Sequence, residues 1–254
     1  MTGKWITLCA LLAAVGLMPA VADAADADFP IWLRFALLPL SEGLHYMAVL
    51  VHEPGHALFH WLFGEPAWPT LDLEHGGGMT YTPGRSFALT AFIYVLAASG
   101  GLLLLRAERK RAAAGLAAAT VMHAALILSG WDLFVSLIMG HGAEIAAGAV
   151  LIALALSRPD ILAPLSERCV ALTVGIYFMA RNFFLCLNLI LNAATRREYA
   201  MQKGIPGLGD YQHAGDVLGV PVQAVAAGMG FFAALSLALA LRYAHRRNSG
   251  KIIF

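Results

Sequence analysis

The chain has 254 residues, of which 59% are hydrophobic and only 13% are charged, and its mean hydropathy is +0.70. These values are far from the averages of soluble domains and exclude a water-soluble protein. The 17 basic and 16 acidic residues nearly cancel, so the net charge does not indicate nucleic acid as a partner. The three cysteines, Cys9, Cys169 and Cys186, fit neither a zinc-binding CxxC spacing nor a disulfide framework.

The first residues have the pattern of an export signal. Lys4 supplies a positive start, residues 6–18 are apolar, and Ala22-Asp23-Ala24 forms a small-residue cleavage pattern. We therefore expect residues 1–24 to be a signal peptide or, alternatively, an uncleaved first membrane helix. Both alternatives leave residue 25 outside the cytoplasm.

Later apolar segments approach the roughly 20 residues that a helix needs to cross a hydrocarbon core of about 30 Å. They lie near 86–106, 113–139, 143–157, 169–193 and 218–243, and a further apolar run covers 31–63. This pattern predicts an all-α polytopic membrane protein, a bundle of about six transmembrane helices that forms a single domain over residues 25–247. Residues 248–254 would be a short cytoplasmic tail.

Basic residues predict the sidedness of the chain. They cluster in the loop at 106–111 and again after the last apolar segment, so the positive-inside rule places both regions in the cytoplasm. A turn expected at 140–144 and a long polar loop at 194–217 then lie outside, in an inner (plasma) membrane protein. The apolar run 31–63 must then begin and end outside, because residue 25 before it and the 64–85 loop after it are both expected there. Because Pro39, Ser41, Glu42 and Gly43 interrupt it, we expect two short crossings or a re-entrant hairpin, unless the 64–85 loop itself dips into the membrane.

The cluster His52-Glu53-Pro54-Gly55-His56 lies within this run. Two histidines four residues apart project from one helix face and can both bind Zn²⁺, with Glu53 as general base for a zinc-activated water. Ionisable residues inside an apolar segment are costly and usually functional. The alternatives are histidines that only bond between helices, and a non-catalytic descendant whose helix Pro54 distorts.

The stretch Met47-Ala-Val-Leu-Val-His52-Glu-Pro-Gly-His56-Ala-Leu-Phe resembles the active-site helix of the site-2 protease (M50-like) family of intramembrane zinc metalloproteases. The resemblance covers residues 44–106. It implies a zinc cofactor, peptide hydrolysis in or near the membrane, and a short Gly-rich β-like segment after the helix, for which residues 71–84 are similar. The family usually supplies its third zinc ligand from an Asp-Gly motif, and this sequence contains no Asp-Gly pair.

A third ligand, either an acid or a third histidine, must therefore come from a later segment on the outer side of the membrane. We favour Asp210 narrowly. Asp216 and Glu144 are the alternatives, although Asp216 could instead cap the last helix and Glu144 could interact with a helix dipole. Asp132, within an apolar run, is a weaker candidate.

The sequence thus predicts a membrane-embedded zinc metalloprotease with its site toward the outer face. Its expected partners are a membrane protein or peptide substrate, the lipid bilayer and accessory membrane proteins, and not nucleic acid. The alternative function is that of a pseudoprotease that binds client helices, or of a metal-binding transporter. The absence of an internal sequence repeat argues against a transporter.

Overall fold

The computed structural model describes residues 3–24, 31–72, 77–157, 164–201 and 209–249, so residues 250–254 of the expected tail lie outside the described part. Within these described ranges, six helices are long and apolar enough to cross a membrane, as expected for an integral membrane protein. The predicted class, an all-α protein with about six helices that could span a membrane, is confirmed by the length and composition of these helices.

The helices are α1 (Gly3–Ala24), α2 (Ile31–Leu62), α3 (Phe87–Arg106), α4 (Lys110–Ser129), α5 (Trp131–Leu156), α6 (Leu165–Leu191), α7 (Ala193–Ala200), α8 (Asp210–Leu218) and α9 (Val222–Asn248).

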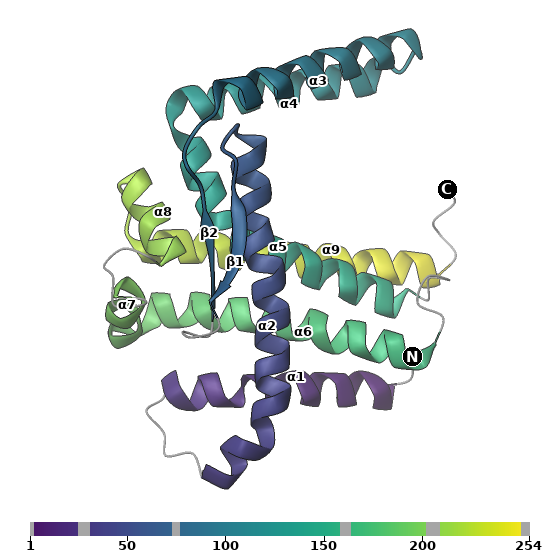
Figure 1. Cartoon of the computed structure of the whole chain (residues 1–254). Coiled ribbons are helices and arrows are strands. Elements are labelled where there is room, and N and C mark those ends of the chain that lie inside the picture. The colour runs from purple at the N-terminus through teal and green to yellow at the C-terminus, as the bar shows by residue number, and fades with distance from the viewer. Residues whose placement is uncertain (1–2, 25–30, 73–76, 158–163, 202–208, 250–254) are drawn as a thin grey trace.

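The long helices do not all run in one direction. In Figure 1, α1, α6 and α9 lie roughly parallel, α2 crosses them, and α3 and α4 form a pair at one end of the molecule. Buried apolar side chains of α5, α6, α8 and α9 form the main core, which includes Ile145, Leu172, Leu189, Tyr211 and Ala226.

Helix α2 is a single uninterrupted helix that contains both Pro39 and Pro54. The expected break at residues 39–43, with two crossings or a re-entrant hairpin, is therefore wrong. Leu44 and Ala48 of α2 are buried in a second core cluster with side chains of α1 and α6. This packing holds the helix together beyond Pro39, because most helical stability in a folded protein comes from tertiary contacts and not from propensity.

The boundary between α4 and α5 also differs from the prediction. The chain breaks at Gly130, whose φ of 75° is left-handed and suits glycine at a helix end. The predicted turn at 140–144 is instead the middle of α5, and Gly140 and Gly142 are helical. The polar loop expected at 194–217 contains two short helices, α7 and α8, the first of which is capped by Asn192.

Helix α1 belongs to the same packed unit. Its Cys9 and Ala13 are fully buried, and the Cys9 thiol donates to the carbonyl oxygen of Cys169 on α6 at 3.5 Å. Whether residues 1–24 are cleaved stays a prediction, but α1 fills space against α6 that its removal would expose.

A two-stranded antiparallel sheet follows α2. Strands β1 (Trp68–Asp72) and β2 (Gly77–Tyr81) pair so that Trp68 lies opposite Tyr81, and the hairpin lies beside α2 (Figure 1). At its base, the amide of Ser86 donates to the carbonyl oxygen of Gly64 at 2.7 Å. Residues 77–81 thus form a strand within the segment where a β-like structure is expected.

Candidate metal centre

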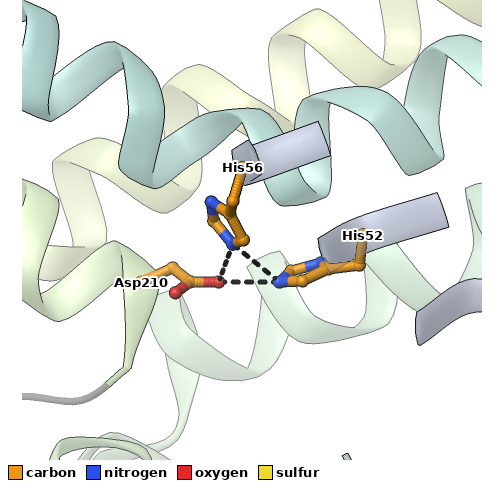
Figure 2. Close-up of side chains that lie close together, drawn as sticks. All are labelled: His52, His56 and Asp210. Carbon is orange, nitrogen blue, oxygen red and sulfur yellow. Dashed lines mark hydrogen bonds and ion pairs between the residues drawn. The ribbon is translucent and has the colours of Figure 1, made fainter. Parts of the chain in front are cut away.

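Three side chains converge between α2 and the start of α8 (Figure 2). The Nε2 atoms of His52 and His56 lie 3.0 Å apart. Oδ2 of Asp210 lies 3.0 Å from Nε2 of His52 and 3.3 Å from Nε2 of His56. The structure therefore brings the favoured acidic candidate, 154 residues beyond His56, into contact with both histidines.

The opposite ring nitrogens show where the imidazole protons lie. Nδ1 of His52 lies 2.7 Å from Oε1 of Glu144, and Nδ1 of His56 lies 2.7 Å from the carbonyl oxygen of Ser136. A carbonyl and a carboxylate accept hydrogen bonds, so each Nδ1 donates its proton outward. In the neutral imidazoles both Nε2 lone pairs then point at Asp210, which leaves three electron-rich atoms facing one point. A cation at that point removes their mutual repulsion.

The three atoms fit the dimensions of a zinc site. Ligands at the usual Zn–N and Zn–O distances in a tetrahedral arrangement are about 3.3 Å from one another. The observed separations of 3.0, 3.0 and 3.3 Å need to widen by a few tenths of an ångström at most. Two imidazoles and a carboxylate are also a donor set that zinc accepts, and three protein ligands leave a fourth position for reactants.

Asp210 is the first residue of α8, where the helix dipole favours a negative charge. Burial disfavours this charge, but His56 and His52, when their Nε2 atoms carry protons in place of a metal, outweigh the effect of burial and hold the pKa of the Asp210 carboxyl well below its usual range. The side chain is therefore a carboxylate, the form that binds metal.

Glu144, one of the two alternative ligands, lies behind His52 and not among the three converging atoms. It is fully buried within α5, and its Oε2 accepts hydrogen bonds from Arg181 at 2.6 Å and Asn182 at 3.0 Å. Donor atoms of His52, His141 and Glu144 are also mutually close. However, the Arg181 cation already neutralises Glu144, which makes this second group a poor place for another cation.

His141 completes this buried network. The amide nitrogen of Asn182 donates to Glu144 and to the carbonyl oxygen of Phe178, which fixes the amide orientation. Its Oδ1 therefore accepts the Nδ1 proton of His141 at 2.9 Å. Nε2 of His141 then faces Oδ2 of Asp210 at 3.7 Å, beside the three converging atoms.

The other acidic candidates lie elsewhere. Asp216 is exposed in the last turn of α8 and accepts a hydrogen bond from Gln212 at 2.9 Å. It does not cap the last helix, because Pro221 precedes α9. Asp132 is buried at the start of α5 and forms an ion pair with Arg85, which leaves it outside the centre.

Glu53 is buried with 7% exposure and faces strand β2, where the Thr80 hydroxyl donates to its Oε2 at 2.8 Å. Gly140 is a further necessary residue. A Cβ atom there would lie 2.3 Å from Nε2 of His56 and 2.7 Å from Nε2 of His52, so only glycine lets α5 pass this close to both.

Sequence reasoning missed five residues of this region. Arg181 and Asn182 could have been found, since polar residues inside an apolar segment are a functional signal. Ser136, which contributes only its carbonyl oxygen, gives no such signal. The five are Thr80, Ser136, Gly140, Arg181 and Asn182.

Comparisons of the chain with protein-family models, with curated proteins and with solved structures found no match.

Proposed function

We propose that this protein is a membrane-embedded zinc metallopeptidase that hydrolyses peptide bonds in or near the bilayer. One observation carries the proposal: Nε2 of His52, Nε2 of His56 and Oδ2 of Asp210 converge at zinc-like separations, and Glu53 adjoins His52 in the helix. Three protein ligands leave a fourth position of the metal open, and an HExxH helix carries its general base next to the first histidine.

His52, His56 and Asp210 would hold the metal, while Glu144 and Ser136 fix the two imidazole rings through their Nδ1 protons. When bound, zinc lowers the pKa of a coordinated water to about 7 and so supplies a nucleophile at neutral pH. Glu53 accepts a proton as general base and returns it to the leaving amine as general acid.

The membrane setting supports a substrate from the same environment. In the part of the chain that the structure describes, six helices are apolar enough to lie in a bilayer, and α2, which carries both histidines and Glu53, is one of them. A site built on such a helix meets peptide segments that are in the membrane or beside it. We also propose that the metal site lies toward the outer face of the membrane, because the basic loops are expected in the cytoplasm.

A cleavage assay tests the enzyme proposal. The purified full chain in detergent micelles, loaded with zinc, is incubated with a mixture of quenched fluorescent peptides. We expect cleavage by the wild-type chain and none by the Glu53→Gln variant, which keeps its zinc because Glu53 is not a ligand. A wild-type protein that binds zinc but cleaves no peptide would support the pseudoprotease instead. Zinc uptake into vesicles that persists in Glu53→Gln would support the transporter.

A further inference from the structure

We infer that Thr80 is a positioning residue that holds the carboxylate of Glu53 in its reactive orientation, an inference that rests on the proposed function. The two residues belong to different elements, since Glu53 lies in α2 and Thr80 in β2. Their contact joins the hairpin to the helix that carries the histidines.

The hydroxyl of Thr80 has two acceptors within reach. Its oxygen lies 2.8 Å from Oε2 of Glu53 and 3.1 Å from the main-chain oxygen of the same residue. A hydroxyl has one proton, and a carboxylate is the stronger acceptor. Thr80 therefore fixes one carboxylate oxygen of Glu53, Oε2, and with it the orientation of the carboxylate.

The strand backbone holds the same side chain from a second direction. A Cβ atom added to Gly78 would lie 2.3 Å from Cγ and 2.7 Å from Oε1 of Glu53. Gly78 and Thr80 are two residues apart in β2 and so lie on the same face of the strand. One face of β2 thus supports Glu53 through backbone contact at Gly78 and through a hydrogen bond at Thr80.

The hairpin is itself anchored, so it can act as a support. Strand β2 pairs along its length with β1, and the backbone bond from Ser86 to Gly64 closes the base of the hairpin. Arg85 reaches Glu65 at 3.3 Å and also pairs with Asp132 on α5. Removal of the Thr80 hydroxyl therefore deletes the hydrogen bond to Glu53 and leaves the anchors of the hairpin and the contacts of His52, His56 and Asp210 in place.

A hydroxyl deletion tests the role. We expect Thr80→Val to lower kcat by about 10- to 100-fold, as small misplacements of catalytic groups do, with KM and zinc content unchanged. Thr80→Ser should restore most of kcat because serine keeps the hydroxyl. Thr70→Val is the matched control, since Thr70 donates to the Met79 carbonyl oxygen at 2.7 Å within the hairpin and lies on the opposite strand. It should leave kcat near the wild-type value.

The outcomes separate this inference from the proposed function. If Glu53→Gln is inactive while Thr80→Val equals the wild type, Thr80 has no positioning role and the peptidase proposal stands. Equal losses of kcat in Thr80→Val and Thr70→Val would mean that the stability of the hairpin, and not the hydrogen bond to Glu53, determines the activity. A wild-type chain without zinc or cleavage overturns both.

A second readout needs no activity. The double variant Glu53→Cys/Thr80→Cys should form a disulfide under mild oxidation, detected by mass spectrometry of the linked peptides. The pair Glu53→Cys/Thr70→Cys should form far less. Equal yields from the two pairs would show that β2 does not lie over Glu53 and would overturn the inference.

Discussion

Nδ1 of His52 lies 2.7 Å from Oε1 of Glu144, a fully buried carboxylate that is 92 residues further along the chain. This contact fixes the ring so that Nε2 faces Asp210, and Arg181 balances the charge of Glu144 at 2.6 Å. Such outer partners orient metal-binding histidines and increase their basicity.

We expect Glu144→Gln to weaken zinc binding by about 10- to 100-fold, the usual effect of losing an outer-shell carboxylate. Competition with a zinc-binding dye measures the affinity, and circular dichroism checks that the variant remains helical. Unchanged affinity in a folded variant would show that Glu144 does not act through His52.

Asp210→Ala should lose zinc almost completely, because the remaining two imidazoles make an incomplete site. Asp216→Ala is the matched control from the same short helix, as Asp216 is exposed and contacts Gln212. Zinc per chain is measured by elemental mass spectrometry. Equal zinc in the two variants would reject Asp210 as the third ligand.

Gly140→Ala should displace the imidazoles and reduce zinc content, since the added methyl would lie 2.3 Å from Nε2 of His56. Gly228→Ala in α9 is the control, because a Cβ atom there meets nothing within 4 Å. Alanine favours helix over glycine by about 1 kcal/mol, so the control should be as stable as the wild type or more so. Full zinc occupancy in Gly140→Ala would contradict the described approach of α5 to α2.

The base of the hairpin should weaken in acid. The hydrogen bond from His60, helped by Arg85, holds the pKa of Glu65 below its ordinary value of 4.5, although partial burial opposes this shift. A carboxyl whose pKa is lower in the folded state stabilises the fold above its unfolded pKa and loses that contribution as the pH falls through the folded pKa. Hydrogen exchange at residues 64–86 should therefore accelerate below about pH 4.5 more in the wild type than in Glu65→Gln, where this group no longer titrates. An identical pH profile in both proteins would contradict the assignment.

Much of the architecture was predictable because apolar length alone determines which segments can cross a bilayer. The helical face that joins His52 and His56 follows from their spacing of four residues, and the search for an outer acid led to Asp210.

Other features required the folded chain. A glycine in the sequence is compatible with a turn and equally with a close contact between helices. Gly140 was therefore predicted to lie in a turn, whereas in the structure it makes room for the imidazoles of His52 and His56. Proline and glycine at 39–43 suggested a break that packing around Leu44 prevents. The contact of Thr80 with Glu53 depends on how the hairpin lies against α2, which no local pattern encodes.

Zinc content tests the central claim most directly. The full chain, purified in detergent without chelator, should contain about one zinc per chain, and His52→Ala and His56→Ala should contain almost none. His60→Ala is the matched control, because His60 is a buried histidine of the same helix that pairs with Glu65 at 2.7 Å and not with Asp210. It should keep its zinc. A folded wild-type chain that binds no zinc, or equal zinc in His52→Ala and His60→Ala, would contradict a metal centre at His52, His56 and Asp210.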